Sequence, residues 1–155
     1  MIERVVNLTP EKAYEELKNL LLGNNGKIVA EKQASSIKVE QGSIWGVSPK
    51  GVKKIISFHF LPKDSGTRIV SVSSLTSDWI ILSALGYVIM GILSPLFWSY
   101  AIGLESSGLY ETWAINYFRF TSILFVLAVI VGITWDIFIY ARKDSFAEDT
   151  LRLLP

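Results

Sequence analysis

One acidic residue stands where a charge is costly. Asp136 interrupts an otherwise uncharged run from Phe120 to Ala141. Ionisable residues inside such apolar segments face protein or water, and they often belong to ion pathways, subunit contacts or interfacial hydration. Ala128, Gly132 and Asp136 are four residues apart, so in a helix they share one face, and the two small residues permit close approach of a second helix.

The partner of this acid is expected in the preceding apolar run. At matching depth that run offers Ser83 and Tyr87. We therefore expect Asp136 to hydrogen-bond Tyr87, Ser83 or water. An ion or proton site, a contact to a partner subunit and an acid reaching headgroup water are alternative interpretations, and the last is favoured because a lone acid makes a poor relay.

Other candidate chemistry fails on residue type or spacing. The chain has no cysteine and a single histidine, His59, which excludes disulfides, thiolate catalysis and multi-His metal sites. Residues 46–51 imitate the glycine spacing of a P-loop, but Val52-Lys53 follows instead of Lys-Ser/Thr. The formal net charge of +1 attracts no nucleic acid. No catalytic residue, cofactor or metal site is therefore predicted, and an enzyme is not favoured.

Two long apolar runs must position Asp136 and its partners. No residue is charged from Trp79 to Leu104, and each run exceeds the roughly 20 residues that span a bilayer. We predict a transmembrane hairpin over residues 78–141, with spans 79–102 and 120–141 and an outer loop 103–119. A buried hairpin in a soluble protein is the alternative, disfavoured because the remaining chain is too small to cover two such helices.

Basic residues orient this hairpin. Residues 103–118 contain no Lys or Arg, whereas the opposite flanks are basic. The positive-inside rule then places both termini in the cytoplasm of a two-span cell-membrane protein. The flanking basic residues are Lys50, Lys53, Lys54, Lys63 and Arg68 before the first run and Arg142 and Lys143 after the second, while Arg119 stands at the far edge of the loop. Lys50, Lys53 and Lys54 either contact anionic headgroups or form a solvated rim.

Residues 1–77 predict a soluble α+β domain with the order β-α-β-β-β-β. Thr9-Pro10 is a favourable helix start, and apolar residues recur at helical spacing up to Gly23. The predicted strands are Ile2–Leu8, Lys27–Gln33, Ser36–Val47, Val52–Leu61 and Thr67–Leu75. The predicted turns are Asn24–Gly26, Ala34-Ser35, Ser48–Gly51 and Pro62–Gly66.

The pairing of these strands defines a core face against which the helix packs. We expect Glu31 opposite Lys38, Val39 opposite Phe60 and Phe58 opposite Val70. The face so formed comprises Ile37, Val39, Trp45, Ile56, Phe58, Phe60, Val70 and Val72. The last strand leads directly into the first apolar run, so the Ser48–Gly51 turn should lie at the membrane-proximal end.

Two shorter segments carry helical patterns. Tyr110, Trp113 and Tyr117 form an aromatic stripe typical of a short helix lying in the outer interface. In the tail, residues 142–155, Ser145 and Glu148 have the spacing of a capping box. We expect a short cytoplasmic helix there, resting on the sheet, the membrane or a partner.

Residues 1–77 resemble the START-like, helix-grip superfamily. The resemblance rests on the opening strand, the helix start from Asn7 to Tyr14, and Gly66–Val70 in a late strand. It implies a cavity between sheet and helix for a lipid or other hydrophobic ligand. The extra strands and the long C-terminal helix of that superfamily are missing from this sequence. In this chain such a cavity would be lined by Tyr14, Leu17, Trp45, Phe58 and Phe60.

These observations leave three functional hypotheses. The first is a membrane-anchored binding or accessory module, in contact with the lipid bilayer and with a membrane-protein partner or further copies of itself. The second is binding of a lipid or hydrophobic ligand by the α+β domain. The third is an oligomeric ion or proton pathway built on Asp136, since two helices per chain cannot form a pore alone.

Overall fold

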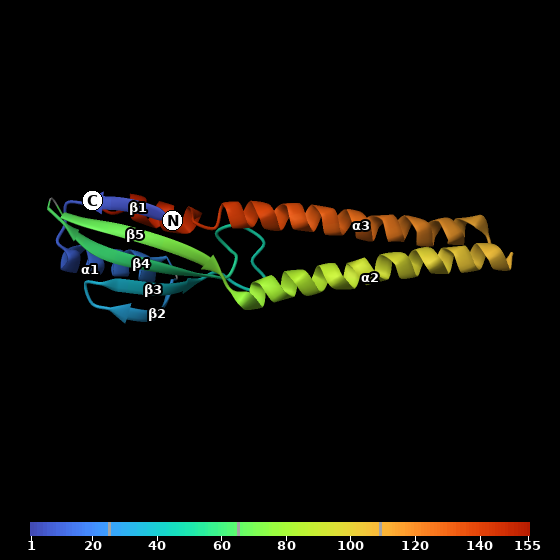
Figure 1. The fold of residues 1–155 in the computed structure, drawn as a ribbon, viewed down its shortest axis with the longest axis horizontal. Helices are drawn as coiled ribbons and strands as arrows, with labels where there is room; N and C mark the ends of the chain where they lie inside the picture. Colours follow the sequence, from blue (N-terminus) through green and yellow to red (C-terminus); the bar gives the residue numbers. More distant parts are fainter. Residues whose placement is uncertain (25, 65, 109) are drawn as a thin grey trace. The chain divides into compact units, whose positions relative to one another are not determined.

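The computed structural model describes residues 1–24, 26–64, 66–108 and 110–155 (Figure 1). The chain forms two compact units, one of Met1–Ile80 with Phe138–Pro155 and the other of Ile81–Ile137. The first is an α+β unit, and it is larger than the predicted domain of residues 1–77 because the C-terminal tail returns to it. The second consists of two long helices.

A five-stranded antiparallel sheet forms the centre of the α+β unit. Its strands are β1 (Ile2–Val6), β2 (Lys27–Lys32), β3 (Ser36–Gln41), β4 (Lys54–Lys63) and β5 (Gly66–Leu75). The order across the sheet is β1-β5-β4-β3-β2, so the four later strands form the predicted meander. The first strand, β1, lies at one edge of the sheet and pairs with the last strand, β5.

Helix α1 (Pro10–Gly23) begins where the sequence predicts it. The Thr9 side chain accepts a hydrogen bond from the Lys12 amide, and Pro10 occupies the first turn. Its buried face consists of Ala13, Tyr14, Leu17 and Leu21.

The core of this unit lies between the sheet and two helices. Helix α4 (Ser145–Arg152) packs on the same core as α1. Its Ala147 and Leu151, together with Leu154, are buried among the residues of α1 and the sheet. Of the three surfaces considered for the tail, α4 therefore rests on the sheet. The capping box is wrong, since Asp144 occupies the N-cap position without a side-chain cap bond and Ser145 already lies inside the helix.

The predicted register between the last two strands is wrong by one residue. Phe58 pairs with Ser71 rather than Val70, which places Val70 and Val72 on the opposite face of the sheet. The core face of β5 instead carries Thr67, Ile69, Ser71 and Ser73. The buried Thr67 hydroxyl is satisfied by donating to the Leu8 carbonyl over 2.7 Å.

The other two predicted pairings also differ. Val39 pairs with Ile56 and not with Phe60, because β3 ends at Gln41 rather than Val47. Glu31 pairs with Ile37 and not with Lys38, because the turn between β2 and β3 has three residues, 33–35, so that Lys32 pairs with Ser36. The Ala34-Ser35 turn is present, with Ala34 at φ 55°. The predicted turns Asn24–Gly26 and Pro62–Gly66 include Asn25 and Ser65, which lie outside the described residues.

Helices α2 (Ser77–Ser107) and α3 (Thr112–Ala141) are long and apolar enough to cross a membrane. Only 6% and 11% of the residues in the most apolar windows of the segments containing α2 and α3 are buried. Core helices of soluble proteins are mostly buried, so this exposure disfavours that alternative.

The helices extend through most of the predicted loop 103–119. Trp113 and Tyr117 lie in the first turns of α3 and not in a separate interfacial helix, while Tyr110 precedes it. Leu109 lies outside the described residues.

Candidate functional site

Residues 42–53, here called the basal loop, connect β3 to β4. Gly42 has φ +88°, and a Cβ at Gly46 would lie 1.9 Å from the Gly51 carbonyl oxygen. The backbone therefore closes on itself only with glycine at these two positions. The closure is held by the Ser43 amide on the Gly51 carbonyl and the Lys53 amide on the Ser43 carbonyl, each 2.9 Å.

The basal loop packs on two helix ends within the α+β unit. Val52 shares a buried cluster with Trp79 in the first turn of α2 and Ile139 in the last turn of α3. The Trp79 indole also donates to the Gly46 carbonyl over 3.3 Å. These contacts hold the loop beside the first turn of α2 and the last turn of α3.

Trp45 is not a core residue. Its side chain is 74% exposed, because β3 has already ended and the basal loop turns it outward. Val47 in the same loop is 73% exposed. The predicted place of Trp45 in the core face and in a ligand cavity is therefore wrong, and the loop carries an exposed aromatic residue beside the helix ends.

Two of the three predicted headgroup lysines are at the surface. Lys50 forms an ion pair with Asp149 at 2.5 Å, and Lys53 pairs with Asp78 at 2.7 Å. The hydrogen bond to Asp78 raises the pKa of Lys53. Exposed pairs of this kind contribute little to stability, so both amines can exchange partners.

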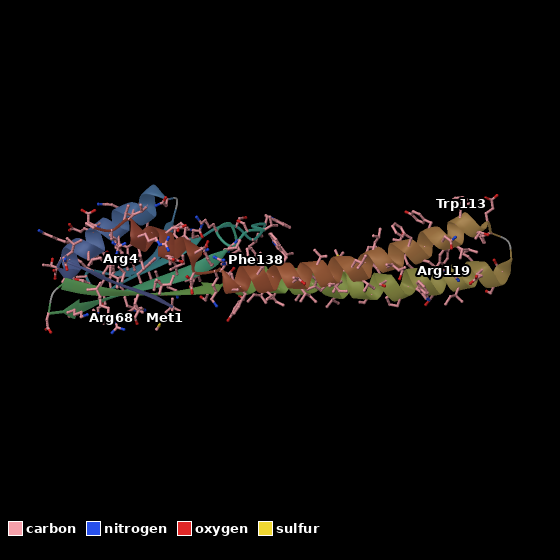
Figure 2. All side chains as sticks on the ribbon, turned by 90° about the horizontal axis from the view of Figure 1, so that it is seen from above. Met1, Arg4, Arg68, Trp113, Arg119 and Phe138 are labelled. Atoms are coloured by element: carbon pink, nitrogen blue, oxygen red, sulfur yellow. The ribbon has the colours of Figure 1, made fainter. Side chains whose placement is uncertain are left out.

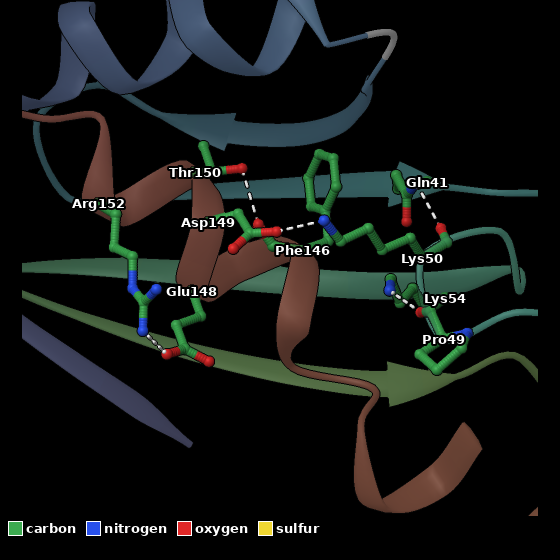
Figure 3. A network of polar contacts seen from close by, with 9 residues as sticks. All are labelled: Gln41, Pro49, Lys50, Lys54, Phe146, Glu148, Asp149, Thr150 and Arg152. Carbon is green, nitrogen blue, oxygen red and sulfur yellow. Dashed lines mark hydrogen bonds and ion pairs between the residues drawn. The ribbon is translucent and has the colours of Figure 1, made fainter. Parts of the chain in front are cut away.

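Lys54 is buried and makes no headgroup contact. It lies on the core face of β4 in phase with Ile56 and Phe58, and its side chain is fully buried. Its amine donates to the Pro49 carbonyl over 2.5 Å and lies 5.8 Å from the centre of the Phe146 ring (Figure 3). Burial lowers the pKa of Lys54 to about 8. Lys54 therefore ties the basal loop to the sheet from inside.

The other predicted cavity residues pack on one another. Tyr14, Leu17, Phe58 and Phe60 belong to one buried cluster, in which the Tyr14 and Phe60 rings meet edge to face at 5.8 Å. The Tyr14 hydroxyl donates to Glu31 over 2.8 Å. These side chains form the interior between α1 and the sheet.

The second unit brings Tyr87 and Asp136 together. The Tyr87 hydroxyl donates to Asp136 Oδ2 over 2.6 Å, which ties α2 to α3. Ser83 lies one helical turn before Tyr87. Gly132 receives the Tyr87 ring, since a Cβ there would lie 2.6 Å from Tyr87 Cε1. The small residue one turn from Asp136 thus makes room for its partner.

Further polar contacts in this unit were not predicted. Ser94 and Ser122 are buried, their hydroxyl oxygens lie 3.0 Å apart, and each hydroxyl also reaches the other's carbonyl. Arg119, which Figure 2 labels on α3, forms an ion pair with Glu105. Small hydroxyl residues in apolar helices are the general signal for such contacts, but the sequence does not state which ones pair.

Comparisons with known proteins identify no family. No protein-family model and no curated protein matches this chain. A crystal structure of protein MLL2253 from Mesorhizobium loti is similar over 50% of this chain and 77% of that chain, with 13% identity and a TM-score of 0.41. At this identity and TM-score the likeness assigns neither a family nor a function to the chain.

Proposed function

We propose that this chain is a two-span integral membrane protein whose α+β unit acts as a cytoplasmic binding or accessory module. The observation that carries the proposal is the exposure of two long apolar helices attached to a well-packed domain. Apolar surface of this extent is stable in a bilayer and unstable in water.

Contacts between the N-terminal strand and the C-terminal tail support a location of both on the same side of the membrane. The Met1 amine contacts Asp144 at 3.0 Å, and Arg4 donates to the Leu151 and Leu154 carbonyls. Two membrane crossings return the chain to its starting side, which agrees with one unit that contains both ends. The basic flanks favour the cytoplasm for that side, and in this orientation we expect the basal loop at the membrane surface.

Topology is tested by cysteine labelling, because the chain has no cysteine of its own. Ser106→Cys and Lys12→Cys change exposed residues of the helical hairpin and of α1. A membrane-impermeant maleimide should label Ser106→Cys in intact cells and Lys12→Cys only after permeabilisation. The reverse pattern contradicts the orientation, and release of the protein by alkaline carbonate contradicts membrane insertion.

The accessory role is tested by native mass spectrometry after gentle extraction. A co-purifying membrane protein, or a defined number of copies of this chain, supports the role. Extraction of the single chain at every concentration contradicts it. A retained lipid without protein would favour the START-like ligand hypothesis, which requires the Tyr14, Phe58 and Phe60 side chains to separate around a ligand.

A further inference from the structure

An open pocket of about 330 Å³ lies at the base of the α+β unit, beside the basal loop. Its lining residues are Ser48, Pro49, Lys50, Phe138, Arg142 and Ser145. All of them belong to one compact unit. The lining combines two cations and two hydroxyls with an aromatic side chain, a combination suited to an anion attached to an apolar group.

Both cations can serve an incoming anion. Arg142 makes no ion pair with any residue that the structure describes, and its planar guanidinium matches two phosphate oxygens. Lys50 pairs with Asp149, but the two side chains are 63% and 49% exposed (Figure 3). Such an exposed pair is weak, so Lys50 can turn to a more highly charged partner.

The two serine hydroxyls of the pocket are both able to donate a hydrogen bond to a ligand. The Ser145 hydroxyl is buried and has no hydrogen-bond partner among the described residues. It lies at the start of α4, where the N-cap Asp144 supplies no side-chain cap bond. The Ser48 hydroxyl oxygen accepts from the Gly51 amide over 3.0 Å, which leaves its proton to donate. An anion in the pocket would satisfy groups that the protein leaves open.

Nearby acids offset only part of this charge, and Arg142 has no ion-pair partner among the described residues. Asp144 pairs with the Met1 amine at 3.0 Å, and Asp149 pairs with Lys50 at 2.5 Å. The buried Lys54 amine lies behind the Pro49 carbonyl and adds positive charge from the sheet side. The pocket surroundings therefore favour an anion.

The position of the pocket indicates the source of the anion. Phe138 lies in the last turn of α3, and Arg142 follows its end directly. If α3 spans a membrane, this is the level at which apolar chains give way to headgroup phosphates. Resting on the proposed membrane insertion, we infer that the pocket binds the headgroup phosphate of an anionic phospholipid. Arg142 and Lys50 contact its oxygens, Ser48 and Ser145 donate to it, and Phe138 lies beside its glycerol and upper acyl chain.

The test uses the full chain in neutral detergent micelles and follows the thermal midpoint of unfolding. Short-chain phosphatidylglycerol, phosphatidylcholine of equal chain length and inorganic phosphate are titrated separately. Phosphatidylglycerol should raise the midpoint saturably, as expected for a ligand of the native state. The variant Lys50→Gln/Arg142→Gln should bind roughly tenfold or more weakly, since two charge-assisted contacts are lost. The matched control Lys12→Gln/Lys63→Gln, which removes two exposed cations elsewhere, should bind like the wild type.

Three outcomes overturn the inference. Phosphatidylcholine could stabilise as well as phosphatidylglycerol, inorganic phosphate could match the lipid at equal concentration, or the double variant could retain wild-type affinity. If the double variant does not fold, Ser145→Ala decides the question, because it keeps every charge and should weaken binding by roughly threefold. The measurement in micelles is independent of topology, so failure of membrane insertion is recognised separately by cysteine labelling and carbonate extraction.

Discussion

The Tyr87 hydroxyl in α2 donates a 2.6 Å hydrogen bond to Asp136 Oδ2 in α3. The Tyr87 ring also covers Gly132, which precedes Asp136 by four residues in α3. A polar group in an apolar segment is costly without a partner, and here each side chain supplies the other's partner. The contact joins the two apolar helices close to the end of α3 that returns to the α+β unit.

Removing the donor from this contact should destabilise the helical hairpin. In Tyr87→Phe the Asp136 carboxyl loses its partner, and the free energy of unfolding should fall by about 1–3 kcal/mol. In the double variant with Asp136→Leu part of that loss should return, because no polar group is left unpaired. Unfolding in detergent micelles measures both. Tyr110→Phe, at an exposed position before α3, is the control. An equal effect of the two Tyr→Phe changes contradicts a role for the contact.

Glycine should be replaceable at some helix positions and not at others. A Cβ at Gly132 meets the Tyr87 ring at 2.6 Å, whereas Cβ atoms at Gly86 and Gly91 meet nothing within 4 Å. Gly132→Ala should therefore lower the thermal midpoint of unfolding, because the ring cannot move away without lengthening its hydrogen bond. Gly86→Ala and Gly91→Ala should leave it unchanged or raise it, since alanine favours the helix. Equal midpoints for all three variants would exclude close packing at Gly132.

Lys54 predicts an unusual dependence of stability on alkaline pH. Burial lowers its pKa from the ordinary 10.5 to about 8. Between these values the unfolded chain binds more protons than the folded one, so stability contributed by this site rises with pH in that window. The full rise is about 3 kcal/mol.

Lys54→Met isolates this contribution. The variant should lose the rise between pH 8 and 10.5. It should match or exceed the wild-type stability at pH 7, since a buried charge is replaced by a side chain of similar length. Chemical unfolding at a series of pH values gives both curves, and Lys12→Met at an exposed position is the control. Parallel curves for wild type and Lys54→Met would show that Lys54 is solvated.

Truncation of Trp45 in the basal loop and of Trp79 in α2 should have effects of very different size on stability. Trp45 is 74% exposed, so Trp45→Ser should change the unfolding free energy in micelles by less than about 0.5 kcal/mol. Trp79 is 7% exposed and packs with Val52 and Ile139, so Trp79→Ser should cost about 3 kcal/mol or more. A large loss of stability in Trp45→Ser would contradict the exposed position of this side chain.

Strand positions were predictable, but the phase of the last strand was not. In β5 each face carries two apolar residues, Val70 and Val72 on one and Ile69 and Leu75 on the other, so alternation alone does not decide which face is buried. The correct phase depends on Thr67 and Ser71, whose buried hydroxyls find backbone carbonyls that only the folded β1 and the segment after it supply. Local patterns do not contain that information.

Side-chain burial next to the basal loop was also not predictable from the local sequence pattern. Lys54 is in phase with Ile56, Phe58 and Phe60 and is buried with them, but it was expected at headgroups or on a solvated rim because lysine is almost never fully buried. Trp45 was misplaced because the end of β3 is set by the glycines of the basal loop. By contrast, the shared face of Gly132 and Asp136 followed from spacing alone, and the structure places Tyr87 on it.

The packing of α4 on the sheet has a consequence for when the core of the α+β unit can form during synthesis. Ala147, Leu151 and Leu154 fill the core beside α1, yet they are translated after both long helices. The sheet therefore emerges from the ribosome with one part of its apolar face uncovered, and it stays so until the hairpin has been made. The core of the α+β unit is therefore complete only after both long helices have been synthesised.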